Sequence, residues 1–340
     1  MQYKISVIIP TYNAENDIKS AIDSIINQTI GFEYIELIIV DDASTDKTKH
    51  IIKNYQKKYD NIILIELTTN SGLPGKPRSI GLDYVSSKYI IFLDADDTYE
   101  KEAFEILYHA SEKEDCDIGI TSHYLNLDGE MIKATLSQSN EEIVSLKPLE
   151  SQKDFDATVN LIAPWGKIFK KELIVKNNIR FPEDSLCEDA YFYLKALINS
   201  EKVIILPKKY LYVYNTFENK NTAIHKHDLE KFNNFLRGMY SCKNLLKDID
   251  LSANVFFENN IASLLLIFSN LNKKDKKQAV LEIYEFEKDL NVQIRRKEVK
   301  ILNNLILKKK FGTAILISNL YSFIYNNSMI KKMYRKLIYK

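Results

Sequence analysis

The chain has 340 residues, 45% of them hydrophobic, which is enough for one large domain and a smaller one. Nine glycines and seven prolines are too few for long disordered linkers. The three cysteines, Cys116, Cys187 and Cys242, are scattered through the chain. This pattern argues against a disulfide framework, matches no zinc-site spacing and favours a reducing, cytoplasmic compartment.

The charge is unevenly distributed, although the net charge is only +1. Residues 295–340 contain twelve Lys and Arg and one acid, Glu298, so this segment carries +11 and the rest of the chain −10. The asymmetry predicts an anionic partner. We expect Met329–Lys340 to bind a membrane surface. The preceding stretch, Phe311–Ile330, is charge-free but too polar to span a bilayer, and we expect it to pack as a helix. No nucleic-acid-binding motif is present.

The first third of the chain alternates between apolar runs and helical patterns. The runs at 5–9, 35–40 and 89–93 are typical of buried strands, and helices are expected at 15–28, 46–59 and 100–114. The run at 5–9 is too short, and its flanks too polar, for a signal peptide. This alternation predicts an α/β fold with a mostly parallel sheet and helices on both faces.

Polar clusters follow all three predicted strands: Pro10–Asn13, Asp41–Asp46 and Asp94–Asp97. The carboxyl ends of parallel strands share one edge of the sheet, where ligands bind in open α/β folds. Carboxylates with substrate phosphates are a typical magnesium arrangement, so Asp94–Asp97 predicts a metal–diphosphate site. An acidic helix N-terminus is the alternative interpretation of this cluster alone.

The rest of the chain changes from mixed to helical. Strands are expected at 118–121 and 203–206, a helix at Ala190–Leu197, and a loop or edge hairpin near the acceptor site at 126–160. Helical spacing then dominates. We expect a catalytic domain at 1–224, with a nucleotide-binding half (1–115) and an acceptor half (116–224), followed by a helical region at 225–340. The helices expected in that region are Leu229–Leu246, Ala253–Leu271 and Asp275–Leu290.

Several segments, in order, resemble motifs of the family-2 glycosyltransferases of the GT-A fold. Each is weak alone, and the ordered set is specific. Pro77 and Ser79 depart from the family's usual Ala and Asn, and the Pro77-Arg78 variant resembles enzymes that decorate teichoic acids. The matching segments are Ser6–Asn13, Val40–Asp46, Asn70–Gly81, Leu93–Asp97, Trp165–Phe169 and Glu188–Phe192.

The resemblance implies inverting transfer of a sugar from a nucleoside diphosphate donor, most simply a UDP-sugar, to a hydroxyl of a cell-envelope glycan, a lipid-linked glycan or a teichoic-acid-like polymer. Asp189 matches the family's general base, and Glu188 would orient it or contact the acceptor. Base and ribose would be held by the first two polar clusters, with Asp42 favoured over Asp41. The donor-binding residues implied are Pro10, Thr11, Tyr12, Asp41, Asp42, Gly72, Arg78, Asp94 and Ala95.

The resemblance also implies a Mn²⁺ or Mg²⁺ ion that neutralises charge on the leaving diphosphate. Asp96 would coordinate it directly, and Asp94 would contact the ribose or the metal. Asp97 is expected to cap the following helix. His225 is a weaker metal candidate, since a surface position in a Lys-rich turn also explains it. Gly72 and Gly75 are expected to let their loop approach the donor closely. Trp165 and Lys167 are expected to line the acceptor site. His109 and His123 match no motif and are expected to be structural.

Two other functions fit parts of the sequence. A nucleotidyltransferase would carry a basic Gly-rich loop after the first strand, where this chain has Pro10–Asn13. A non-catalytic scaffold recruited to the inner face of the membrane would not need the acidic residues Asp94–Asp97 and Glu188–Asp189, which are present.

Overall fold

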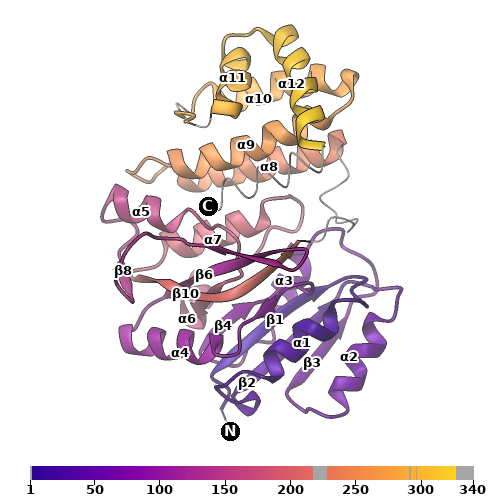
Figure 1. Cartoon of the computed structure of the whole chain (residues 1–340), viewed down its shortest axis with the longest axis vertical. Coiled ribbons are helices and arrows are strands. Elements are labelled where there is room, and N and C mark those ends of the chain that lie inside the picture. Colours follow the sequence, from indigo (N-terminus) through magenta and orange to yellow (C-terminus); the bar gives the residue numbers. More distant parts are fainter. Residues whose placement is uncertain (1, 217–227, 291, 296, 327–340) are drawn as a thin grey trace. The chain divides into compact units, whose positions relative to one another are not determined.

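The computed structural model describes residues 2–216, 228–290, 292–295 and 297–326. The chain forms two compact units (Figure 1). The first comprises Met1–Asp184 and Glu188–Glu218, and the second comprises Ser185–Cys187 and Asn219–Lys340. The predicted boundary at residue 224 and the metal candidate His225 lie outside the described residues.

The first unit is built on one mixed sheet with the strand order β3-β2-β1-β4-β9-β6-β10-β5. Strands β3, β2, β1 and β4 are parallel, as are β6 and β10, whereas β9 runs antiparallel between β4 and β6. Strand β7 pairs with β6, and β8 with β10. The bounds are β1 Ile5–Thr11, β2 Ile35–Asp41, β3 Ile62–Glu66, β4 Tyr89–Phe92, β5 Thr98–Tyr99, β6 Ile118–Leu127, β7 Glu130–Ala134, β8 Val144–Leu146, β9 Lys167–Lys170 and β10 Val203–Thr216.

Strands β1, β2 and β4 are buried on both faces, since every residue of each is buried and most of their side chains are apolar. Helices α1 (Ile18–Ile26), α2 (Thr48–Gln56) and α4 (Ala103–Glu114) share a core with Ile5, Val7 and Ile9 of β1. Helix α3 (Gly75–Leu82) packs on the opposite face, where Gly81 lies against Ile8. The predicted α/β sheet with helices on both faces is therefore confirmed.

The segment 126–160 is more structured than the expected loop or hairpin. The hairpin exists, since β6 pairs with β7, but β8 and helix α5 (Gln152–Thr158) follow it. Ser151 caps α5 by accepting a hydrogen bond from the Asp154 amide, which explains where this short helix begins. The remaining helices of the first unit are η1 Phe32–Tyr34, α6 Lys171–Lys176 and α7 Glu188–Ile198.

The second unit is helical, as predicted. Three of its helices end within three residues of the expected bounds, and their apolar faces bury Phe232, Phe256, Phe268 and Phe286. None of the described helices combines the length and apolar character needed to span a bilayer. The bounds are α8 Leu229–Leu246, α9 Asn254–Asn270, α10 Lys273–Glu287, α11 Lys297–Leu307 and α12 Phe311–Asn326.

Candidate active site

Two neighbouring strands bring the first two polar clusters together. Thr11 and Asp41 are register partners at the ends of β1 and β2, and both side chains are buried. Asp41 Oδ2 accepts a hydrogen bond from the Ser44 amide at 2.9 Å. Asp41 Oδ1 and Thr11 Oγ1 are buried without a hydrogen-bond partner in the described structure. Because such groups are costly unless satisfied, these two atoms mark a place for a polar ligand.

The neighbouring Asp42 is engaged by the loop that follows β3. Both of its carboxylate oxygens accept hydrogen bonds from the Ser71 amide, at 2.9 and 3.0 Å, and Ser71 Oγ donates to Oδ2 at 2.8 Å. Gly72 has a φ of 80°, a left-handed conformation that glycine adopts without strain. Of the other residues predicted here, Pro10 is buried and Tyr12 is 50% exposed.

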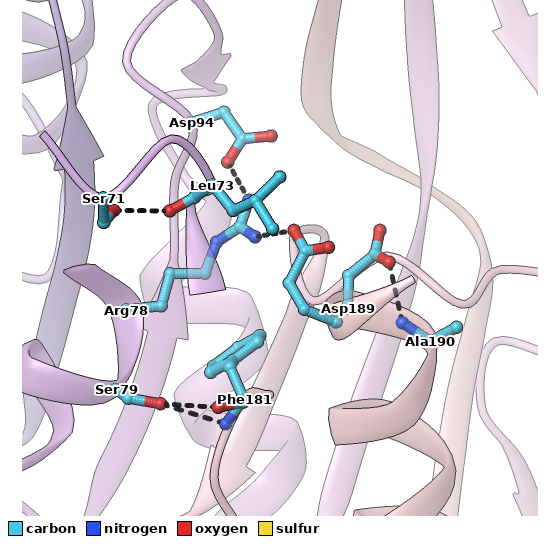
Figure 2. A network of polar contacts seen from close by, with 9 residues as sticks. Ser71, Leu73, Arg78, Ser79, Asp94, Phe181, Asp189 and Ala190 are labelled. Atoms are coloured by element: carbon cyan, nitrogen blue, oxygen red, sulfur yellow. Dashed lines mark hydrogen bonds and ion pairs between the residues drawn. The ribbon is translucent and has the colours of Figure 1, made fainter. Parts of the chain in front are cut away.

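Arg78 lies on helix α3, where the sequence led us to expect an open Gly/Pro loop. Pro77 occupies the third helical position, where an absent amide hydrogen breaks no intrahelical bond. Gly75 begins the helix, and a Cβ there would lie 2.4 Å from the carbonyl oxygen of Pro182. The Ser79 hydroxyl accepts a hydrogen bond from the Phe181 amide at 3.0 Å and donates to its carbonyl oxygen at 3.2 Å (Figure 2). These contacts fix α3, and Gly75 lies in its first turn instead of in the preceding loop.

The guanidinium of Arg78 joins two of the acidic motifs (Figure 2). Nη2 is 2.8 Å from Asp94 Oδ1, and Nη1 is 3.2 Å from Glu188 Oε1. The side chain of Arg78 is 6% exposed. Burial alone would lower its pKa, but Asp94 and Glu188 raise that pKa overall, so the cation is fixed at this position.

Helix α7 begins at the acidic pair Glu188-Asp189. Burial, followed by the charge of Asp189, raises the pKa of Glu188 to about 7 despite the opposing effect of Arg78. Burial also raises the pKa of Asp189, against the opposing effect of Arg78. Asp189 is partly exposed, and its Oδ1 accepts a hydrogen bond from the Ala190 amide at 2.7 Å (Figure 2). A partly exposed carboxylate with a raised pKa is suited to accept a proton.

The third acidic cluster follows β4. Asp94, Ala95 and Asp96 are partly exposed, whereas Asp97 is 1% exposed. Asp97 does not cap α4, whose N-cap residue is Glu102. Its carboxylate instead accepts hydrogen bonds from the Tyr212 hydroxyl at 2.6 Å and the Asn215 amide at 2.7 Å. The expected cap was wrong, and Asp97 holds the acidic turn against β10.

Asp94 and Asp96 offer partly exposed carboxylate oxygens, the ligands that a hard divalent cation prefers. Burial raises the pKa of Asp97 well above its usual range, and the negative charges of Asp94 and Asp96 raise it further. In the parts of the chain that the structure describes, no group of three or more His, Cys, Asp or Glu side chains is placed to hold a metal. The protein would therefore supply Asp94 and Asp96, and substrate phosphates and water would complete the coordination.

The two predicted acceptor residues are buried. The indole of Trp165 is 9% exposed and stacks on Tyr212 with ring centroids 4.5 Å apart. Lys167 is fully buried, and its ammonium donates to the Ala163 carbonyl oxygen at 2.6 Å. Burial lowers the pKa of Lys167 well below its usual range, although Asp189 partly opposes this effect. Neither side chain offers much surface to an acceptor.

His123, expected to be structural, is 8% exposed and packs edge-on against Trp165 at 5.1 Å. Sequence reasoning missed Ser71, Tyr212 and Asn215. The polar residue beside Gly72 was a signal for Ser71. No motif marked the two residues of β10 that hold Asp97.

The chain is similar in sequence to known proteins. The family model "Glycosyl transferase family 2" matches residues 6–174. A poly(ribitol-phosphate) beta-glucosyltransferase of Bacillus spizizenii is 34% identical over 203 residues, which are 59% of this chain and 31% of that protein. A cholesterol galactosyltransferase of Borreliella burgdorferi is 27% identical over 363 residues, covering 95% of this chain and 97% of that protein.

The fold also matches a solved structure. The crystal structure of S. aureus TarS 1-349 in complex with UDP-GlcNAc superimposes with a TM-score of 0.72 at 23% identity, covering 94% of this chain and 91% of that one. This likeness confirms the expected GT-A-like fold. The chain spans only about a third of the length of the Bacillus enzyme, at 31%. The family match, the ordered motifs and the shared fold together show that this chain belongs to the family-2 glycosyltransferases.

Proposed function

We propose that this chain transfers a hexosyl or N-acetylhexosaminyl group from a UDP-sugar to a hydroxyl of a teichoic-acid-like polymer, with inversion at the anomeric carbon. The observation that carries the proposal is the double ion pair of Arg78. This residue links Asp94, in the acidic turn proposed to face the donor, to Glu188, the neighbour of the proposed base. Donor and acceptor chemistry would thus meet around one fixed cation.

In the proposed reaction, the acceptor hydroxyl oxygen attacks the anomeric carbon as the bond from that carbon to the diphosphate oxygen breaks. Asp189 accepts the hydroxyl proton, and UDP leaves with the bonding electron pair. No covalent intermediate with the protein is needed. The raised pKa of Asp189 strengthens it as a base, and a positioned base contributes about 10²–10⁴-fold to such a step.

The nucleoside would bind where β1 and β2 end. The unsatisfied Asp41 Oδ1 is suited to accept a hydrogen bond from a uracil imide or a ribose hydroxyl, while Thr11 Oγ1 can donate or accept. Asp42, favoured from the sequence, already accepts three hydrogen bonds from Ser71. We therefore assign direct nucleoside contact to Asp41 and positioning of the loop at 70–73 to Asp42.

A divalent cation held by Asp94 and Asp96, when bound, would supply positive charge to the leaving diphosphate. The protein itself keeps both carboxylates in place. Asp97 anchors the turn to β10, and Arg78 orients Asp94. Because Arg78 is committed to two carboxylates, we assign it this orienting function in place of the direct donor contact that the resemblance implied.

Different observations support two classes of acceptor. The relative that acts on poly(ribitol phosphate) is 34% identical over 203 residues, and Pro77-Arg78 resembles the same group of enzymes. The cholesterol galactosyltransferase matches almost end to end but at 27% identity. We favour the polymer because the sequence identity to that relative is higher, and we keep a sterol-like lipid as the second candidate. We also propose that the enzyme acts at the inner face of the cytoplasmic membrane, which is consistent with either acceptor.

The test is a transfer assay with UDP-glucose, UDP-galactose and UDP-N-acetylglucosamine against poly(ribitol phosphate) and against sterol-containing vesicles, with Mn²⁺ or EDTA. We expect UDP release and a polymer-linked sugar from one donor, with loss in Asp96→Ala or EDTA. Sterol glycosylation without polymer glycosylation would replace the acceptor. Full activity of Asp96→Ala in EDTA would refute the proposed metal site.

A further inference from the structure

We propose that the outer face of α11 and the start of α12 bind an anionic lipid surface. The corner Lys308–Lys310 lies between these two helices, which pack on each other in the second unit (Figure 1). The proposal makes no use of the basic segment at 327–340, which lies outside the described residues. The proposal goes beyond the transferase activity and does not depend on it.

Helix α11 is amphipathic. Leu302, Asn303 and Ile306 are buried against the unit. The opposite face exposes positions 300, 301, 304, 307 and 308, which lie on one stripe of an α-helix. This stripe carries Ile301, 56% exposed, and Leu307, 37% exposed, with a lysine at each end. Apolar side chains framed by lysines are typical of helices that lie in the interface of a membrane.

The corner after α11 adds more positive charge. Lys308, Lys309 and Lys310 are all exposed, and Lys309 has a φ of 56° in a turn closed by hydrogen bonds from Lys309 to Ile306 and from Lys310 to Leu305, each 2.8 Å. Lys308–Lys310 follow the C-terminus of α11, where cations are favourable, and precede the first turn of α12, where they oppose the helix dipole. An anionic surface would offset the second, unfavourable contribution.

The first turns of α12 are also partly exposed and carry no charge. Leu316 is 71% exposed, the most exposed of the large hydrophobic residues in the described structure. Residues 300–319 contain four lysines and no acid. Apolar side chains favour a lipid over a soluble polyanion, because a polyanion would leave Ile301 and Leu316 in water.

The experiment is flotation of the full chain with phosphatidylcholine vesicles that contain either no phosphatidylglycerol or about 30 mol% of it. Lys308→Gln/Lys309→Gln/Lys310→Gln is compared with Lys273→Gln/Lys274→Gln/Lys277→Gln, which removes the same charge from exposed lysines of α10. We expect binding that needs phosphatidylglycerol, a decrease of about a hundredfold for the first triple variant, and a much smaller decrease for the second. Ile301→Ser/Leu316→Ser should lower binding about tenfold and leave its salt dependence unchanged.

An equal loss in both triple variants would refute a local lipid surface. Unchanged binding of Ile301→Ser/Leu316→Ser would also overturn the proposal, because these side chains would then not enter the membrane. A third contrary outcome is that soluble poly(ribitol phosphate) displaces the protein from vesicles through the same lysines, which would assign the surface to a polyanion. Transfer activity in solution should be unchanged in all three variants, so failure here is distinguishable from failure of the proposed activity.

Discussion

Arg78 on α3 and Glu188 at the start of α7 form a buried ion pair although 110 positions separate them in the sequence. Both side chains are less than one-tenth exposed. Asp94, 27% exposed, accepts the second hydrogen bond of the same guanidinium. One residue thus sets the distance between the turn that would hold the donor and the helix that carries Asp189.

Replacement of Arg78 should therefore impair stability and catalysis together. Arg78→Ala leaves Glu188 buried without its cation, which costs about 3–5 kcal/mol in such sites. Arg78→Lys keeps the charge but lacks the planar fork needed to reach both acids. We expect Arg78→Lys to fold with a smaller loss of stability and to lower kcat more than it raises the KM for the donor. Urea unfolding and steady-state kinetics measure the two effects.

The matched control is Lys53→Ala, which breaks the ion pair with Glu66 on the surface, where the two side chains are 50% and 41% exposed. Exposed pairs contribute about 0–1 kcal/mol, so this variant should be nearly neutral. If Arg78→Ala were as stable as Lys53→Ala, the buried pair would not be the structural element described here.

The sequence predicted the parts of the fold in which one pattern dominates. Runs such as 37–40 are apolar without interruption because both faces of the strand are covered, and helices α8 and α9 show clear apolar spacing. Helix α3 was missed because its sequence, GKPRSIGL, contains two glycines and a proline that normally break helices. Its stability comes from contacts with residues 100 positions away, such as that of Ser79 with Phe181.

The site was predictable in its components and not in its connections. The pattern placed Asp94 and Asp96 at one edge of the sheet, and the resemblance assigned Glu188 and Asp189 to the same reaction. An acid in a turn reads the same in sequence whether it caps a helix or is buried, so Asp97 was assigned to the wrong partner. Strand β9 was likewise unpredictable, because four residues, KIFK, carry no signal for their antiparallel insertion between β4 and β6.

Tyr212 should matter for donor binding although it is fully buried. Tyr212→Phe removes the hydrogen bond to the buried carboxylate of Asp97, which costs about 1–3 kcal/mol. Because Asp97 anchors the acidic turn, we also expect weaker UDP-sugar binding in the presence of Mn²⁺. Calorimetry with UDP-sugar and thermal unfolding test the two effects. Tyr210→Phe, on the same strand but bonded to the exposed Thr135, is the control and should change neither quantity.

Asp189→Asn should abolish transfer while it leaves donor affinity nearly unchanged. The amide cannot accept the proton, so we expect the transfer rate to fall by about 10²–10⁴-fold or more. Rapid-quench transfer and calorimetry with UDP separate the two effects. Loss of donor binding by the folded variant would contradict the assignment of Asp189 as the base.

The pH dependence of transfer should reflect the same acidic pair. A base works only when ionised, so activity should fall as the pH decreases through the raised pKa of Asp189, and the acid limb should lie above the usual range of an aspartate. Glu188→Gln removes a neighbouring negative charge and should move this limb to lower pH. The profile of kcat/KM measures the shift. The control is Glu183→Gln, a substitution at an exposed position, which should leave the acid limb in place. If Glu188→Gln also left the acid limb in place, Glu188 and Asp189 would not titrate together.

Glu287 at the end of α10 should make the helical unit less stable as the pH rises. It is 5% exposed, its Oε1 has no partner in the described structure, and burial raises its pKa from 4.5 to about 8. Between these two values the unfolded chain has lost a proton that the folded protein keeps, so the free energy of unfolding decreases with pH.

Glu287→Gln cannot ionise, so its free energy of unfolding should not decrease in this way. The variant should be more stable than the parent at pH 8.5 by about 4 kcal/mol, with little difference at pH 4.5. Urea unfolding followed by far-ultraviolet circular dichroism measures the effect, while the fluorescence of Trp165, the single tryptophan, reports on the first unit and should not change. Glu285→Gln, which removes an exposed acid from the same helix, is the control, and equal pH profiles for the two variants would show that burial of Glu287 has no such cost.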